Sequence, residues 1–241
     1  MSDDSSDKKV GLWQWPKEQW GIFVGVFVSM LSLYAPLYIL GPFLTSFVVP
    51  LDVSLDFKLS LAQLVIAVVS LFILAGALLA YNKKFKDLGL KYPYISDLGL
   101  AIVGFFVYFV GTLAVGIIYQ QILHQPDQPQ DIGYQHGLAG FDLIFAGAVL
   151  TVLVPIKEEL IFRGFLFKGL RSRLPFWVSA LGVSILFGLV HGQWNVGLDV
   201  FVMSMVSCYL VEKTNSIWPS IFLHIIKNAI AFYLRYIYNG G

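Results

Sequence analysis

The sequence has few charged residues and almost no cysteine. Of its 241 residues only 13% are charged, whereas 57% are hydrophobic, and the mean hydropathy is +0.74. A net charge of +1 argues against a nucleic-acid partner, which would need a basic surface. The lone cysteine, Cys208, lies in an apolar run and cannot form an intramolecular disulfide, so we interpret it as a small buried hydrophobic residue.

The chain also lacks a polar segment long enough to fold as a soluble domain. Instead, apolar runs close to the ~20 residues that a helix needs to cross hydrocarbon recur along it. The runs fall at residues 20–41, 59–81, 97–119, 141–168, 175–192, 196–212 and 217–238. The composition therefore predicts an all-α, polytopic transmembrane helical bundle of about seven spans. The short fifth and sixth runs are also compatible with a single re-entrant excursion.

The N-terminus lacks the basic region that opens a secretory signal, because residues 1–7 are acidic. We therefore interpret residues 1–19 as a polar tail with an interfacial segment. Successive loops should lie on alternate sides of the membrane, and the loops of one side hold eleven Lys and Arg residues whereas those of the other hold two. Cytoplasmic loops are the ones enriched in Lys and Arg. The larger set is Lys8, Lys9, Lys17, Lys83, Lys84, Lys86, Lys91, Lys168, Arg171, Arg173 and Lys213; the smaller is Lys58 and Arg235. This bias predicts a cytosolic N-terminus in a multi-pass protein of the plasma (inner) membrane.

Ionisable residues are rare inside the predicted spans, yet Lys157, Glu158, Glu159 and Arg163 stand together in the fourth. Each charge near the bilayer centre costs about 2.5–3.5 kcal/mol on insertion scales, or roughly 10 kcal/mol for the cluster before pairing. Pro155 has no amide hydrogen, so we expect the helix to kink or restart there and to place the carboxylates in its first turns. A cost of this size indicates a functional cluster.

Residue spacing predicts how these charges pair. Glu159 and Arg163 are four residues apart and can meet on one helix face, whereas Glu158 is rotated by about 100° from Glu159. We therefore expect Arg163 to neutralise Glu159 and to leave Glu158 as the unpaired carboxylate. The alternative is a buried ion-pair network that only holds helices together.

Two further polar elements follow in later runs. His191 ends the fifth run, four residues after Phe187, and taken alone it is also compatible with an interfacial histidine. His224 and Asn228 are four residues apart in the last run and project the same way, as in a pair that joins helices by hydrogen bonds. Three such elements in successive regions of an apolar chain favour a shared intramembrane site.

These side chains suit the activation of water for acyl hydrolysis, because no candidate Ser or Cys nucleophile stands among them. Glu158 is the candidate general base, and His191 is placed to orient the water or share its proton. His224 and Asn228 can donate hydrogen bonds to a tetrahedral oxyanion. The sequence has no His-Glu-x-x-His zinc helix and no Gly-x-Gly-Asp motif, and the segment at Ser184 lacks the second glycine of a rhomboid-type serine.

At these residues the chain resembles the CPBP family, which carries the Abi domain and comprises type II CAAX prenyl endopeptidases and bacterial relatives linked to bacteriocin processing or self-immunity. The family motifs Glu-Glu-x-x-x-Arg, Phe-x-x-x-His and His-x-x-x-Asn stand here, in order, as Glu158-Glu159-Leu160-Ile161-Phe162-Arg163, Phe187-Gly188-Leu189-Val190-His191 and His224-Ile225-Ile226-Lys227-Asn228.

This resemblance implies a glutamate-dependent intramembrane endopeptidase with residues 140–238 as its catalytic region and residues 20–139 as N-terminal transmembrane helices. It implies that Glu158 and His191 activate water, that His224 and Asn228 stabilise the oxyanion, and that three residues support them. The supporting residues are Glu159, Arg163 and Phe187.

Three alternatives stay open at the level of sequence. The first is a zinc-dependent version of the protease with Glu158, His191 and His224 as metal ligands, although the motifs need no cofactor. The second is a proton-coupled carrier, and the third is a non-catalytic immunity protein that binds a partner. For the protease, we expect the substrate to be a peptide or lipidated protein in the bilayer that is cut from the cytosolic side. We expect binding to favour substrates with an anionic terminus, such as a free α-carboxylate.

Overall fold

The computed structural model describes residues 22–41, 52–123, 134 and 138–238, and all regular structure within these residues is helical. The tail at residues 1–19 lies outside the described residues. The elements are α1 (Ile22–Ala35), η1 (Pro36–Leu40), α3 (Leu55–Ala80), η2 (Phe85–Leu88), α4 (Ile95–Leu123), α5 (Gly140–Ala148), η3 (Val149–Leu153), α6 (Val154–Glu159), η4 (Leu160–Phe167), α7 (Lys168–Arg171), α8 (Phe176–Leu189), α9 (Trp194–Thr214), α10 (Trp218–Phe232) and η5 (Tyr233–Tyr238).

Each of the seven predicted apolar runs is helical over most of its described residues, which confirms the all-α helical bundle. Among the described residues, four helices are long and apolar enough to cross a membrane: Leu55–Ala80, Ile95–Gln121, Gly140–Arg171 and Trp194–Thr214. The helices Phe23–Ala35 and Phe176–Leu189 are apolar but shorter. The fifth run, at α8, therefore has too few residues to span hydrocarbon on its own.

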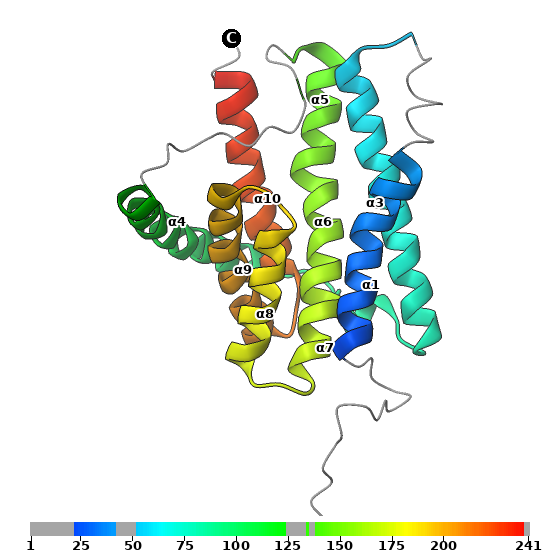
Figure 1. Cartoon of the computed structure of the whole chain (residues 1–241), viewed down its shortest axis with the longest axis vertical. Coiled ribbons are helices and arrows are strands. Elements are labelled where there is room, and N and C mark those ends of the chain that lie inside the picture. Colours follow the sequence, from blue (N-terminus) through cyan, green and yellow to red (C-terminus); the bar gives the residue numbers. More distant parts are fainter. Residues whose placement is uncertain (1–21, 42–51, 124–133, 135–137, 239–241) are drawn as a thin grey trace, which may run out of the picture.

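A long central helix, Gly140–Arg171, organises the bundle (Figure 1). It runs without interruption through α5, η3, α6, η4 and α7, with α1 and α3 on one side and α8, α9 and α10 on the other. The expected kink or restart at Pro155 is wrong: the turns before it widen into the π-helix η3, and the chain continues as α6. Because the helix begins at Gly140, the carboxylates do not lie at a helix N-terminus.

The helices α8 and α9 form a close hairpin that holds the turn containing His191. Gly188 and Gly197 face each other so closely that a Cβ built on Gly188 lies 2.8 Å from the carbonyl oxygen of Gly197. Ser184 Oγ donates to Ser204 Oγ at 2.8 Å across the same interface. Small residues allow two helix backbones to approach this closely. Close packing matters inside a membrane because lipid chains are as apolar as the helices, so the hydrophobic effect does not drive the helices together.

The helix α4 is strongly inclined to α9 and α10 and packs across both (Figure 1). Gly104 and Gly111 provide the room, since a Cβ at Gly104 would lie 2.8 Å from Leu223 and a Cβ at Gly111 would lie 2.8 Å from Val202. This crossing places the middle of α4 beside α10, the helix that carries both His224 and Asn228.

Most of the turns that carry the larger basic set lie at one end of the bundle. Lys168 Nζ donates to Asn215 Oδ1 at 3.1 Å, and Arg171 forms an ion pair with Glu212 at 2.9 Å. Trp218 Nε1 donates to the carbonyl of Lys91 at 2.6 Å. These contacts join α7 to the end of α9, and the start of α10 to the loop between η2 and α4. The cytosolic orientation of this end stays a prediction.

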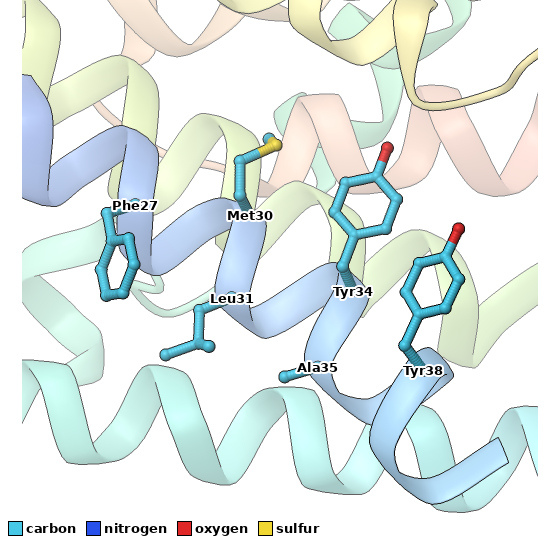
Figure 2. A pocket seen from close by; sticks show the side chains of 6 residues that line it. All are labelled: Phe27, Met30, Leu31, Tyr34, Ala35 and Tyr38. Atoms are coloured by element: carbon cyan, nitrogen blue, oxygen red, sulfur yellow. The ribbon is translucent and has the colours of Figure 1, made fainter. Parts of the chain in front are cut away.

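A shallow apolar groove of about 320 Å³ runs along α1 (Figure 2). Tyr34 and Tyr38 stack on one face of this segment with their ring centroids 5.9 Å apart. Its other lining residues are Phe27, Met30, Leu31 and Ala35. Because this lining has no charged side chain and none of the motif residues, we interpret the groove as surface that contacts lipid chains.

We expect Gly188→Ala to destabilise the protein by about 1–3 kcal/mol, because the added methyl group meets the backbone of Gly197, which cannot rotate away. Thermal unfolding in detergent measures this loss. Gly182→Ala is the matched control in the same helix, since nothing lies within 4 Å of its added Cβ. If both variants unfold at the same temperature, the close approach of α8 and α9 does not stabilise the fold.

Candidate active site

Polar side chains of the first and third motifs meet at the carboxylate of Glu159. This residue and Arg163 are fully buried, and Arg163 Nη1 lies 2.9 Å from Glu159 Oε1, as the four-residue spacing predicted. His224 Nδ1 lies 2.8 Å from the same oxygen, and Ser220 Oγ donates to Oε2. The carboxylate of Glu159 therefore connects the central helix to α10 through hydrogen bonds with Ser220 and His224, and Arg163 adds an ion pair from within the central helix.

Phe187 packs on the other side of the arginine. The guanidinium carbon of Arg163 lies 4.3 Å from the Phe187 ring centroid, within the range of a cation–π interaction. The same ring stands edge-on to His191 at 5.0 Å and to His224 at 6.0 Å between centroids. The buried Phe187 ring thus packs against Arg163 and against both imidazoles.

Glu158 differs from Glu159 in both exposure and partners. Its side chain is 15% exposed, and its Oε2 lies 3.9 Å from His224 Nε2. The expectation that Glu158 has no cationic partner is wrong, because Lys157 Nζ lies 3.5 Å from its Oε1. The flexible four-carbon stem of Lys157 brings the ammonium back to the neighbouring residue, which sequence spacing on an ideal helix did not indicate. The pairing favours an ionised Glu158.

Both imidazoles use Nδ1 for support and leave Nε2 for other contacts. His191 Nδ1 lies 2.7 Å from the carbonyl oxygen of Phe187, and a carbonyl only accepts, so Nδ1 carries the hydrogen. His224 Nδ1 faces the carboxylate of Glu159 in the same way. The Nε2 of His224 points toward Glu158, and a water molecule between the two can contact both at their 3.9 Å separation.

Asn228 contacts the backbone of the central helix beside Pro155. Its Nδ2 donates to the carbonyl oxygen of Leu150 at 3.1 Å. In a π-helix that carbonyl would accept from the residue five positions later, which is Pro155, and proline has no amide hydrogen. Asn228 therefore replaces the hydrogen bond that Pro155 withholds. The second hydrogen of its amide group is the one available to a substrate.

The structure gives no support to a preformed three-residue zinc site. Within the described ranges, no three His, Cys, Asp or Glu side chains are arranged so that they could hold a metal ion. The candidate ligand set Glu158, His191 and His224 is thus not assembled in this conformation.

Ser220 is a site residue that lies outside all three motifs. It is fully buried on α10 and precedes His224 by four residues, so both side chains face Glu159. This spacing is visible in the sequence, but its importance depends on how α10 docks against the central helix. Sequence reasoning therefore recorded His224 and Asn228 and missed the serine one turn before them.

A helical bundle with a buried polar cluster of this composition defines a multi-pass integral membrane protein with an intramembrane site. Residues 140–230 match the family described as type II CAAX prenyl endopeptidase Rce1-like. This match confirms the resemblance carried by the three motifs and covers all of their residues.

Relatives in bacteria show the same likeness over a similar length. A protein of Bacillus subtilis named "Putative membrane peptidase YdiL" is 31% identical over 87 residues, which are 36% of each chain. Protein YxdF of Lactococcus lactis is 28% identical over 100 residues, which are 41% of this chain and 54% of the relative. The matched segment thus spans about a third to a half of the curated relatives. No solved structure matches the chain.

We expect Ser220→Ala to lower turnover by about 10-fold to 100-fold, the usual cost of losing a group that orients a reacting side chain. Since Ser220 holds only one oxygen of Glu159, Arg163 and His224 keep their contacts and the fold should persist. Ser220→Thr, which keeps the hydroxyl, should recover activity. Ser204→Ala is the control for removing another buried serine hydroxyl. Equal activity of Ser220→Ala and wild type would exclude the orienting role.

Proposed function

We propose that the protein is a glutamate-dependent intramembrane endopeptidase. The observation that carries this proposal is the contrast between the two adjacent carboxylates. Glu159 is fully buried and bound by Arg163, Ser220 and His224, whereas the partly exposed Glu158 faces the free nitrogen of His224. A buried, fully bonded carboxylate suits a structural role, and an accessible ionised one suits a general base.

In the proposed reaction Glu158 takes a proton from a bound water, and the resulting hydroxide attacks the carbonyl carbon of the scissile peptide bond. The charge that develops on the carbonyl oxygen is stabilised by hydrogen bonds from His224 Nε2 and the second amide hydrogen of Asn228. In this step Nε2 donates from the doubly protonated imidazole, whose Nδ1 hydrogen faces the Glu159 carboxylate. Collapse of the intermediate breaks the C–N bond, and the proton held by Glu158 passes to the leaving amine.

His191 is the second group that contacts the water in this scheme. Its Nδ1 hydrogen is engaged by Phe187, so the neutral ring offers the Nε2 lone pair. Glu158 and His191 lie close enough to interact electrostatically. Accepting a hydrogen bond from the water orients the oxygen lone pair toward the substrate, which assists Glu158 without a second full proton transfer.

The proposed substrates are membrane-associated peptides or lipidated proteins of the plasma (inner) membrane. If the basic end of the bundle is cytosolic, substrates approach from the cytosol beside Lys168, Arg171 and Arg173. The cations at this end favour an anionic segment, such as a C-terminus with a free α-carboxylate. Prenylated CAAX proteins, which the description of the matching family indicates as substrates, are one example of this substrate class.

A zinc-dependent form of the same protease is the alternative that shares its residues. It would use Glu158, His191 and His224 as ligands, and the free Nε2 atoms of the two histidines are compatible with metal binding. Metal analysis of the purified protein, with activity measured in a strong chelator, separates the two forms. Stoichiometric zinc that is lost together with activity would replace the metal-free mechanism.

We expect Glu158→Gln to abolish or nearly abolish proteolysis, by about 10²-fold to 10⁴-fold, because the isosteric amide cannot accept the proton of the water. Comparative proteomics of membranes carrying wild-type or variant protein should show uncut species that accumulate in the variant. Glu212→Gln makes the same chemical change at the Arg171 ion pair and should leave the cut products unchanged. A phenotype that survives Glu158→Gln would point to transport or non-catalytic binding instead.

Asn228→Ala tests whether this amide acts on the substrate as well as on the backbone. Loss of an oxyanion donor should lower kcat by about 10²-fold to 10³-fold. Loss of the bond to the Leu150 carbonyl should lower the unfolding free energy by about 1–3 kcal/mol. Kinetics and thermal unfolding of the same preparation measure both effects. A destabilised variant with full activity would restrict Asn228 to its backbone contact.

A further inference from the structure

A second polar cluster lies between α4, α9 and α10, outside the three motifs. Asp199 Oδ1 accepts hydrogen bonds from Tyr108 Oη and Thr112 Oγ1, each at 2.7 Å. Its other oxygen, Oδ2, lies 3.4 Å from Lys227 Nζ. The side chains of Asp199 and Lys227 are 28% and 17% exposed, so both are half-buried and open to exchange with another polar group.

Lys227 belongs spatially to the candidate active site. It follows His224 by three residues on α10 and directly precedes Asn228, the two proposed oxyanion donors. A lysine in this position can therefore contact a substrate that lies between α10 and the turn after α8.

We propose that Lys227 binds a carboxylate of the substrate close to the scissile bond, with Asp199 holding the ammonium in place until that carboxylate arrives. This inference rests on the proposed proteolysis, because it assigns the residue that recognises an anionic substrate end. Its ligand is a peptide with a free carboxylate, and Lys227 acts as a specificity-determining residue.

The partners of Asp199 make this exchange feasible. Tyr108 and Thr112 are four residues apart on α4 and hold Oδ1 independently of Lys227, so Asp199 keeps two hydrogen bonds when the ammonium turns away. An ammonium has three donors on a flexible stem and can contact two carboxylates at once. The substrate carboxylate in turn gains a charge-assisted hydrogen bond in a region of low dielectric constant.

A purely structural reading of the cluster predicts a different behaviour. If Asp199 and Lys227 only fasten α4 to α9 and α10, removing either charge weakens the fold and affects all substrates alike. A recognition role instead makes the effect of Lys227 depend on whether the ligand carries a carboxylate. The two readings are thus separated by ligand chemistry rather than by loss of activity.

The test compares two prenylated peptides of the Cys-a-a-X type that differ only in a C-terminal carboxylate or carboxamide. Binding is measured to the full-length Glu158→Gln protein in detergent, so that the readout does not depend on cleavage. We expect the carboxylate peptide to bind about 10-fold more tightly, the effect of one charge-assisted hydrogen bond. Adding Lys227→Met should remove this preference and leave carboxamide binding unchanged.

Two further variants complete the design. Lys213→Met removes an exposed lysine from the end of α9 and should keep the preference. Asp199→Asn removes the competing carboxylate and should strengthen binding of the carboxylate peptide. If the ion pair is only structural, Asp199→Asn and Lys227→Met should each weaken the binding of both peptides. Thermal unfolding of each protein confirms that it is folded.

The proposal is overturned if Glu158→Gln protein binds the two peptides equally or binds neither, or if the preference persists after Lys227→Met. Failure of proteolysis itself gives a different pattern. In that case wild-type protein cuts neither peptide, while the preference for the carboxylate, which is measured in the binding assay, still reports on Lys227.

Discussion

The candidate site depends on one buried carboxylate. Glu159 has no contact with solvent, and Arg163, His224 and Ser220 together stabilise its buried charge. Two of these partners come from α10, and hence the packing of α10 against the central helix and the direction of the His224 ring are set by the same bonds. A stable fold and an ordered site are therefore not separable here, and the more accessible Glu158 is left free for chemistry.

A second constraint comes from Pro155. The proline deprives the central helix of one backbone hydrogen bond, the helix widens into a π-turn, and Asn228 supplies the missing donor from α10. The helix thus stays continuous across the region where a break was expected. The same asparagine is consequently held against the backbone of the central helix, and such a fixed position is what the proposed role as an oxyanion donor requires.

Local features of the sequence predicted much of this arrangement, because they depend on hydropathy and on helical spacing. The seven apolar runs are helices, and Arg163 meets Glu159 four residues away. Features that depend on how helices dock were not predictable in the same way. Ser220 matters only because α10 lies against Glu159, and Pro155 is accommodated only because Asn228 is within reach. The ion pair of Lys157 with Glu158 was not predicted, because the flexible lysine side chain reaches a neighbour that ideal helical spacing places on a different face.

The shortness of α8 has a consequence for the surrounding lipid. Its 14 residues rise only about 21 Å, against about 30 Å of hydrocarbon, so the turn that carries His191 ends inside the bilayer. Backbone groups at that turn need water or polar headgroups, which draws the adjacent leaflet inward and thins it locally. The access of water to Glu158 should therefore depend on membrane thickness. A thicker, more ordered bilayer opposes this thinning and restricts the entry of water.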